Sequence, residues 1–386
     1  MRETGSNNET LKQKNRGLVL RLVTTGECTS RIGVAKYTGL SKMAATNIIS
    51  QLIEEDILEE KETIRVKGKG RNPIQLDLSK RAPKLIGVNI ASDICSVVLC
   101  DMHLRIIGKT GFYVRKVDPD KIMENICRCI DRVIKKSPKE QFWGIGVAAP
   151  GPVDLLRGMV LSHSGFAEME NIPIVEILEE KYHMPVLLES RQNCAALAEK
   201  YYGNGHDTED LLLVGIGEEI GSGVISHGNL RESASGMTPE IGHMSIDMNG
   251  RECCCGRKGC LRAYIEGSVL RAEYAEATGS DVTFREICRA AEKGEEAADR
   301  ILGEMTEKLA CSLVNAVNLL GPQKVILGGE GFRLPEKYVR EQEQLINTGK
   351  LSPEPLTICT SALGEEAGTR SSAARLLMEI FEGELN

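Results

Sequence analysis

The α/β part of the chain begins at LIGVNIASDICSVVLCD (residues 85–101), which reads as a strand, a turn and a second strand. Apolar runs of the same kind return downstream, separated by stretches with helical periodicity. These runs are FWGIGVAA (142–149), MPVLLES (184–190), LLLVGIG (211–217) and KVILGG (324–329). Alternating strands and helices predict an α/β body, and we expect it to occupy residues 84–386.

The N-terminal segment has a different pattern. We expect residues 1–10 to form a disordered tail and residues 11–80 to form a winged helix-turn-helix domain. Three helices are predicted from LKQKNRGLVLRLVTT (11–25), SRIGVAKYTGL (30–40) and KMAATNIISQLIEEDIL (42–58). Two strand-like segments follow, LEEKETIRV (58–66) and PIQLDL (73–78), joined by a basic turn. This order is typical of a helix-turn-helix followed by a wing.

The third helix has the side chains expected to read DNA. Lys42, Thr46 and Ser50 recur every four residues, opposite an apolar stripe, and Asn47 lies beside them. Lysine can pair with guanine or phosphate, asparagine with adenine, and threonine with a thymine methyl group. The predicted DNA-binding residues, including the helix cap and the wing, are Ser41, Lys42, Thr46, Asn47, Ser50, Lys67, Lys69 and Arg71. The alternative is a three-helix packing whose basic face is merely solvated.

The charge distribution favours DNA binding by the N-terminal segment alone. The chain has 386 residues and a formal net charge of −7. Residues 1–84 contain 16 Lys and Arg against 10 Asp and Glu, whereas the rest contains 32 against 45. A basic head on an acidic body suggests that only the head meets phosphate. The polar N-terminus and the absence of a long apolar run predict a cytoplasmic protein that does not contact membranes.

A dense cysteine cluster predicts a metal site. The chain has 13 cysteines, and four of them fall within residues 253–260. His243, Cys253, Cys255 and Cys260 offer one imidazole and three thiols, while Cys254 is the expected non-ligand. Four nitrogen and sulfur ligands with no open position are typical of structural zinc. The alternative is a set of unpaired buried cysteines.

These features together resemble the ROK family, which groups sugar-responsive repressors and sugar kinases. The head is similar to the repressor branch at Ser30-Arg31, Thr38-Gly39-Leu40-Ser41 and Gly70-Arg71-Asn72-Pro73. The body is similar at Ala149-Pro150-Gly151-Pro152, Asn193-Cys194-Ala195-Ala196, Glu240-Ile241-Gly242-His243 and the cysteine cluster. The resemblance implies an actin-like ATPase fold in two lobes, a sugar site in the cleft, and a homodimer or homotetramer.

Three departures from the family's kinases imply that this body is not an enzyme. The first phosphate loop, Asp-x-Gly-Gly-Thr in the family, is Asn89-Ile90-Ala91-Ser92-Asp93 here, which reads as a β-hairpin. The second, Gly-Thr-Gly-Ile-Gly-x-Gly, is GEEIGSG (217–223), with two carboxylates that would repel phosphates. Arg191 stands at the family's general base, and an arginine cannot take a proton at a working pH.

The resemblance also implies which residues meet a ligand. The expected set is Glu189, Arg191, Asn193, Glu240, His243 and Arg262. Because Arg191 and Arg262 replace acidic family residues, one hypothesis is an anionic sugar derivative as ligand. The alternative is that both arginines pair with Glu189, Glu240 or Glu266 in a vestigial pocket.

The sequence thus predicts a repressor of carbohydrate-related genes that binds double-stranded operator DNA and a sugar. The rival functions are an active, ATP-dependent sugar kinase with a DNA-binding appendage and a DNA-binding interaction protein without a ligand.

Overall fold

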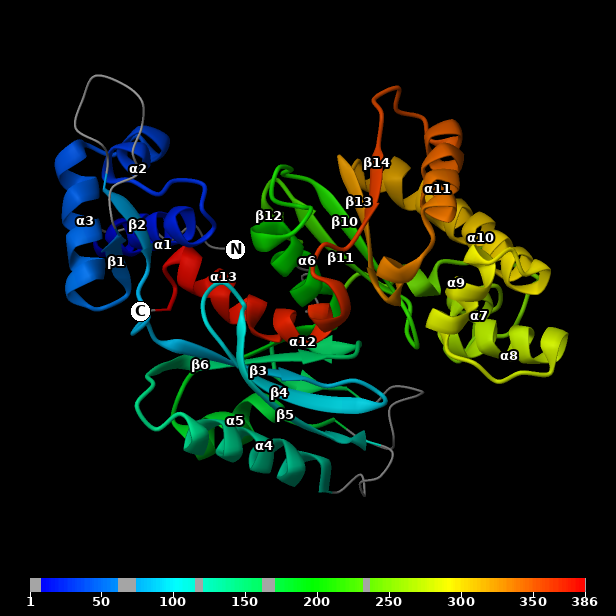
Figure 1. Ribbon diagram of the computed structural model, residues 1–386, viewed down its shortest axis with the longest axis horizontal. Coiled ribbons are helices and arrows are strands. Elements are labelled where there is room, and N and C mark those ends of the chain that lie inside the picture. The colour runs from blue at the N-terminus through cyan, green and yellow to red at the C-terminus, as the bar shows by residue number, and fades with distance from the viewer. Residues whose placement is uncertain (1–7, 62–73, 115–120, 162–170, 232–236, 386) are drawn as a thin grey trace.

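The computed structural model describes residues 8–61, 74–114, 121–161, 171–231 and 237–385. It shows an N-terminal head beside a body of two lobes, each built on a five-stranded sheet (Figure 1). No helix in these described ranges is long and apolar enough to cross a membrane. The α/β body and the helical head expected from the sequence are therefore both present.

The head consists of three helices and a two-stranded antiparallel sheet. Its elements are α1 (Asn8–Thr24), α2 (Arg31–Thr38), α3 (Lys42–Glu54), β1 (Leu58–Lys61) and β2 (Gln75–Leu78). Because α1 begins at Asn8, residues 8–10 are helical, and the predicted tail is wrong there. The predicted apolar stripe of α3 is confirmed, since Ala45, Ile48, Ile49 and Leu52 are its buried residues. The turn between β1 and β2 lies outside the described residues.

The N-terminal lobe is a mixed sheet with helices on both faces. Its strands, in spatial order, are β5 (Ile106–Tyr113), β4 (Ile94–Cys100), β3 (Lys84–Asn89), β6 (Phe142–Ala149) and β9 (Val186–Ser190). Strands β3 and β4 pair antiparallel, with Gly87 opposite Val98, which confirms the predicted hairpin. Helices α4 (Ile122–Lys136) and α5 (Ile174–Tyr182) cover one face. The short strands β7 (Val153–Asp154) and β8 (Met159–Val160) pair with each other beyond β6.

The C-terminal lobe repeats this plan. Its sheet, in spatial order, contains β12 (Asn229–Leu230), β11 (Gly221–Ser226), β10 (Leu211–Ile216), β13 (Lys324–Gly329) and β14 (Thr357–Thr360). The helices that follow β12 in the chain are α7 (Arg262–Ile265), α8 (Gly267–Thr278), α9 (Phe284–Glu292), α10 (Glu296–Leu320) and α11 (Glu336–Gly349). Helix α6 (Arg191–Tyr202), which precedes this sheet in the chain, packs on β10 and β11. After β14 the chain returns to the N-terminal lobe through α12 (Ala367–Arg370) and α13 (Ala374–Glu382).

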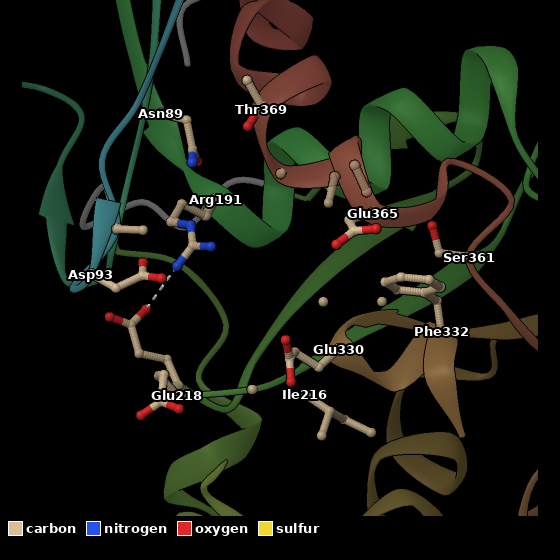
Figure 2. Close-up of a pocket in the computed structure, with 18 of the residues that line it drawn as sticks. Asn89, Asp93, Arg191, Ile216, Glu218, Glu330, Phe332, Ser361, Glu365 and Thr369 are labelled. Atoms are coloured by element: carbon tan, nitrogen blue, oxygen red, sulfur yellow. Dashed lines mark ion pairs between the residues drawn. The ribbon is translucent and has the colours of Figure 1, made fainter. Parts of the chain in front are cut away.

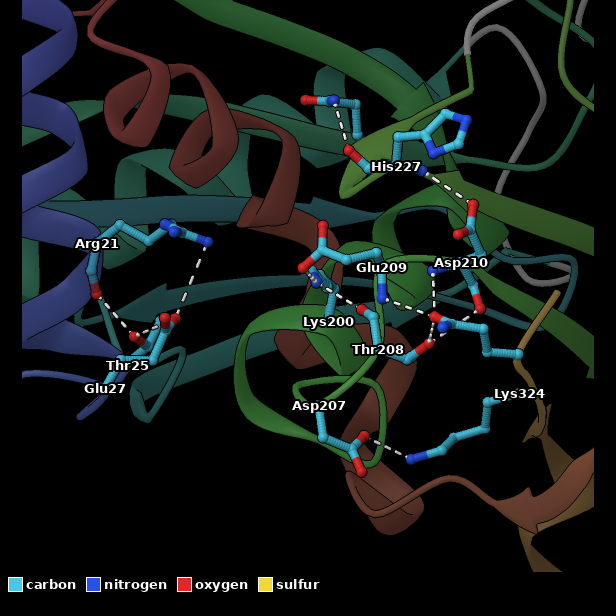
Figure 3. Close-up of polar contacts among 12 residues, drawn as sticks. Arg21, Thr25, Glu27, Lys200, Asp207, Thr208, Glu209, Asp210, His227 and Lys324 are labelled. Carbon is cyan, nitrogen blue, oxygen red and sulfur yellow. Dashed lines mark hydrogen bonds and ion pairs between the residues drawn. The ribbon is translucent and has the colours of Figure 1, made fainter. Parts of the chain in front are cut away.

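A polar cluster holds the loop between α6 and the second sheet. The side-chain oxygen of Gln323 accepts hydrogen bonds from the Thr208 hydroxyl at 2.6 Å and from the Glu209 and Asp210 amides at 3.1 and 3.2 Å. Lys200, at the end of α6, donates to the Thr208 carbonyl at 2.5 Å (Figure 3). These bonds tie the C-terminal end of α6 firmly to the second lobe.

The head and the body share one hydrophobic core. Helix α1 lies against α13, and Val19 and Leu20 belong to the same cluster of buried residues as Ile380 and Phe381. The two helices meet at Gly17, where a Cβ would lie 2.4 Å from the Phe381 carbonyl oxygen. Only glycine permits this approach of two backbones. The head is therefore packed on the body rather than tethered beside it.

Candidate functional site

The side chains predicted to meet DNA line the start of α3. The Ser41 hydroxyl caps this helix, accepting a hydrogen bond from the Ala44 amide at 3.1 Å. Lys42, Thr46 and Asn47 follow it and are exposed. The N-terminal half of α3 thus presents an ammonium, a hydroxyl and an amide, the groups that read base edges in a major groove.

Ser50 differs from the other predicted contacts because it is half-buried and bonded. Arg31 Nη1 lies 3.0 Å from Ser50 Oγ and 3.1 Å from the Thr46 carbonyl oxygen, and it donates to both. Arg31 Nε donates to Glu60 Oε1 at 3.0 Å. Arg31 therefore links α3 to α2 and β1 through Ser50 and Glu60, and the contact of Ser50 with DNA stays a prediction.

Arg31 holds α3 in place, whereas the sequence marks it only as part of a family motif. It bonds across 19 residues of chain to Ser50, so no local pattern marks it as a brace. The predicted wing contacts Lys67, Lys69 and Arg71 lie outside the described residues and stay predictions.

The predicted metal ligands come together in one group. The ligand atoms of His243, Cys253, Cys255 and Cys260 all lie within 4.8 Å of one another. Cys253 Sγ is 3.6 Å from His243 Nδ1, and Cys255 Sγ is 3.7 Å from Cys260 Sγ. Cys254 is exposed and stands outside the group, as expected.

The geometry of this group fits a tetrahedral metal ion. With Zn–S bonds of about 2.3 Å and Zn–N bonds of about 2.0 Å, ligand atoms lie roughly 3.5–3.8 Å apart. The two separations above match these edges. Gly259 adopts φ of +71°, and a Cβ there would lie 1.6 Å from the Asp247 carbonyl oxygen, so the tight turn requires glycine. The hydrogen bond from the Arg257 backbone lowers the pKa of Cys255 to about 7, which favours the metal-binding thiolate.

A cleft of about 600 Å³ separates the two lobes (Figure 2). Asn89 and Asp93, at either end of the β3–β4 turn, line one wall, and Glu330 and Phe332 line the opposite wall. Burial raises the pKa of Glu330. The side-chain oxygen of Asn89 is buried and has no hydrogen-bond partner among the described residues. The cleft is therefore open and polar, with acidic groups on both walls.

Both carboxylates of the predicted second loop line this cleft and form ion pairs. Glu218 forms a bidentate ion pair with Arg271: Arg271 Nη1 donates to Glu218 Oε1, and Arg271 Nη2 donates to Glu218 Oε2 at 3.1 Å. Glu219 Oε2 lies 3.7 Å from Arg191 Nη1. A nucleotide phosphate brought to this loop would meet two carboxylates instead of the small, uncharged groups that cradle phosphates.

Arg191 lies at the start of α6 and lines two pockets. Together with Gln192 and Glu219 it borders both the large cleft and a smaller pocket of about 30 Å³. Its Nε is buried without a hydrogen-bond partner among the described residues. The Arg191–Glu219 pair therefore forms a partition between the two pockets.

Glu240 and Arg262, both predicted ligand residues, line the smaller pocket. The Thr238 hydroxyl donates to Glu240 Oε1 at 3.2 Å. Burial raises the pKa of Glu240 to about 7, although the Thr238 bond opposes the rise. Arg262 Nε donates to Glu266 Oε2 at 2.9 Å. The alternative interpretation of the sequence paired both arginines with Glu189, Glu240 or Glu266. Arg262 does pair with Glu266, whereas Arg191 pairs with Glu219, which was not among the expected partners.

Glu189, Asn193 and His243 border neither pocket. Glu189 is fully buried, accepts from the Asn193 side-chain amide at 3.0 Å and lies 3.7 Å from Arg375 Nη1. His243 belongs to the metal group. In this structure these three side chains lie behind the pocket wall, and their direct contact with a ligand stays a prediction.

The comparisons with known proteins agree with this architecture. The model of the ROK family matches residues 85–378. The chain is 27% identical to the xylose repressor of Caldicellulosiruptor bescii over 357 residues, covering 88% of this chain and 89% of the relative. It is 28% identical to the DNA-binding transcriptional dual regulator NagC of Escherichia coli over 356 residues, covering 89% and 87%.

Solved structures resemble the chain at two levels. A ROK family transcriptional regulator, a homologue of the E. coli MLC protein, aligns with a TM-score of 0.82 at 22% identity, covering 97% of this chain and 98% of that one. A ROK hexokinase from Thermus thermophilus aligns with a TM-score of 0.65 at 27% identity, covering 77% and 99%. The regulator therefore matches the head and the body, whereas the kinase covers a smaller part of the chain.

Proposed function

Because the chain belongs to the ROK family, we propose that it is a transcriptional repressor of carbohydrate-related genes whose body binds a sugar without phosphorylating it. Two relatives that match nearly 90% of the chain are a xylose repressor and NagC. A protein of this kind acts on chromosomal DNA, so we place it in the cytoplasm. Since the two relatives differ in name and stand below 30% identity, they support the class of regulator and leave the effector open.

The main support for this proposal is the exposed polar face of α3, on a head that shares its hydrophobic core with the body. Lys42, Thr46 and Asn47 are exposed, whereas Arg31 and the cap at Ser41 fix the helix that presents them. Double-stranded operator DNA is the partner that this face fits. In a homodimer or homotetramer, two heads would meet two half-sites separated by a whole number of helical turns.

Phosphoryl transfer is disfavoured at each step that it requires. A kinase needs a base to take the sugar proton and a cradle for the ATP phosphates. At the position of the base, Arg191 keeps its proton and pairs with Glu219. At the position of the cradle, Glu218 and Glu219 present negative charge. The body thus keeps the fold of a sugar kinase without its chemistry.

The sugar is proposed to bind beside Glu240. Its carboxyl, with a pKa near 7, can donate or accept a hydrogen bond at neutral pH. A pocket of about 30 Å³ is too small for a sugar ring, so binding requires the Arg191–Glu219 partition to move and join the pocket to the cleft. Arg191 would then face the ligand, and an acidic sugar derivative would replace Glu219 as its partner.

Two short helices give a physical route from this pocket to the head. Helix α6 starts at Arg191 in the cleft and ends at Tyr202 beside the head. Helix α12 has Thr369 in the cleft and Arg370 beside the head. A ligand that moves the first end of either helix changes the support of the head at the other end. Such coupling amounts to about 1–3 kcal/mol in typical regulators.

The metal group is proposed to hold structural zinc. His243, Cys253, Cys255 and Cys260 would bind the ion, which supplies a cross-link between the segment of Glu240 and the cysteine turn. Because His243 is three residues from Glu240 on the same short segment, the cross-link would hold Glu240 at the pocket wall.

The proposal is tested by selecting genomic fragments with the purified full-length protein. The affinity of the best fragment is then measured by fluorescence anisotropy, with neutral sugars, sugar acids and sugar phosphates added in turn. We expect one fragment to bind far more tightly than random DNA, and one sugar to change that affinity about 5- to 150-fold. Equal affinity for all fragments would refute DNA-directed regulation. Sugar-dependent ATP consumption would refute the loss of catalysis.

A further inference from the structure

A second cavity lies where the head meets the body, apart from the cleft. Its volume is about 410 Å³, within the range of roughly 300–1,000 Å³ that small-molecule pockets occupy. The head supplies the end of α1, the turn after it and β2. The body supplies the β4–β5 turn and the ends of α6 and α12. Any molecule bound here would touch both parts at once.

Most of the charged groups that line this junction cavity are cationic. Arg105 and Arg370 both line it, and neither forms an ion pair with a carboxylate among the described residues. Within the described ranges, the Arg370 side chain forms one hydrogen bond, from its Nε to the Leu104 carbonyl oxygen at 3.1 Å. His103 adds a third group that is positive when protonated. The Asp101 carboxylate fixes this turn, accepting from the amides of His103 at 2.9 Å and Arg105 at 3.0 Å.

Two acidic groups near the cavity are already paired with cations. Asp77, the one carboxylate among the described residues that line it, is bonded to Lys61, accepts from the Leu78 amide at 2.7 Å and lies 3.7 Å from His103 Nε2. Glu27, on the adjoining turn, is held by Thr25 and Arg21 (Figure 3). The carbonyl ends of α1 and α6 each add a partial negative charge, about half an electron at most. The guanidinium groups of Arg105 and Arg370 carry two full positive charges, which exceed these partial charges.

We infer that the junction cavity binds a phosphate group, held by Arg105 and Arg370 between the head and the body. The planar fork of a guanidinium matches phosphate oxygens, and two unpaired forks from different elements can take one phosphate together. Tyr202 and Thr24 also line the cavity, although their hydroxyls donate to backbone carbonyls of Met102 and Leu20. The volume leaves room for a phosphorylated small molecule rather than the ion alone.

Binding here would act on the same helices that reach the cleft. Arg370 follows Thr369, which lines the cleft, and Tyr202 ends the helix that Arg191 begins. A phosphate that bridges Arg370 to the head would therefore hold the head in one orientation. The inference does not depend on the identity of the sugar or of the operator.

The test is isothermal titration calorimetry of the zinc-loaded, full-length protein with inorganic phosphate at constant ionic strength. We expect one phosphate site per chain. The Arg105→Gln and Arg370→Gln variants should each bind phosphate about 10- to 100-fold more weakly, as expected when a hydrogen bond to a charged group is removed. Arg340→Gln, an exposed arginine on α11, is the matched control and should bind like the parent protein. Among the described residues the Arg105 side chain forms no hydrogen bond or ion pair, so Arg105→Gln reports binding even if Arg370→Gln perturbs folding.

A parent protein that binds no phosphate, or variants that bind it equally well, would overturn the inference. A second arm distinguishes a free metabolite from the DNA backbone as the source of the phosphate. If the source is DNA, Arg105→Gln lowers the affinity for a non-specific duplex. It also reduces, by about one, the slope of the logarithm of the binding constant against the logarithm of the salt concentration. If the source is a metabolite, duplex affinity in phosphate-free buffer is unchanged while phosphate binding is lost.

Discussion

The substitution Gly17→Ala tests whether the head is rigidly packed on the body. A Cβ at this position would lie 2.4, 2.7 and 2.8 Å from three backbone atoms of residues 380–383. Since backbone atoms cannot rotate away, α1 must move from α13 by at least about 0.6 Å to restore a 3.0 Å contact. Overpacking of this kind costs about 1–3 kcal/mol of stability. Alanine also favours the helical state over glycine by about 1 kcal/mol, which acts in the opposite direction.

The control Gly303→Ala separates these two effects. Gly303 lies within α10, and nothing is within 4 Å of the Cβ that alanine would add. We therefore expect Gly303→Ala to raise the free energy of unfolding by up to about 1 kcal/mol. The free energy of unfolding of Gly17→Ala should be lower than that of this control by about 1–3 kcal/mol, which is the cost of overpacking alone.

The assay is thermal and urea unfolding of both variants, followed by DNA binding with and without the effector sugar. We expect Gly17→Ala to keep most of its DNA affinity, because α3 is untouched, and to lose part of its response to sugar. If both glycine variants were equally stable, the close approach of α1 and α13 would not exist in solution. If Gly17→Ala were destabilised but kept a full sugar response, the helix crossing would not transmit the signal.

Further predictions address the other sites. Cys255→Ser should reduce bound zinc from about one ion per chain to none and lower the melting temperature, whereas Cys254→Ser should retain zinc; equal zinc content by mass spectrometry would contradict the ligand set. Asn47→Ala should weaken operator binding by about 1–3 kcal/mol, with the exposed Gln344→Ala on α11 as control, and an unchanged dissociation constant would remove Asn47 from the interface. Glu240 has a pKa raised from 4.5 to about 7, so the folded state binds its proton more tightly than the unfolded state. The contribution of Glu240 to the free energy of unfolding is therefore fully present below pH 4.5 and is lost as the pH rises through 7. Glu240→Gln should flatten this slope in urea unfolding between pH 5 and pH 8, by at most about 3 kcal/mol.

Features formed by nearby residues could be predicted from the sequence. The buried stripe of α3 follows from helical periodicity over 8 residues, and the structure has the same four residues at 0–9% exposure. The metal group needed only one histidine and a short run of cysteines and glycines, because a tight turn brings such ligands together. The β3–β4 hairpin was likewise predicted from one continuous segment.

Features formed by distant residues could not be predicted in this way. Glu219 as the partner of Arg191 depends on how the two lobes close, and nothing in either segment specifies it. The hydrogen bond from Arg31 to Ser50 comes from another helix, so the spacing of residues along α3 could not predict it. The junction of Gly17 with α13 joins opposite ends of the chain, so only the folded structure shows why that glycine is needed.

In the proposed function, the loss of catalysis and the gain of regulation are physically related. A regulator reports the concentration of its ligand only if the ligand binds and leaves unchanged, so that the two states stay in equilibrium. Arg191 stands where the family's kinases are expected to have their base, and it places a charged side chain at the first residue of α6. In the proposed mechanism a ligand would break the pair of Arg191 with Glu219 and would shift α6, which reaches the head at its other end. One residue would then both prevent turnover and form a contact whose free energy differs between the two states, which is the requirement for a ligand to shift the equilibrium of the head.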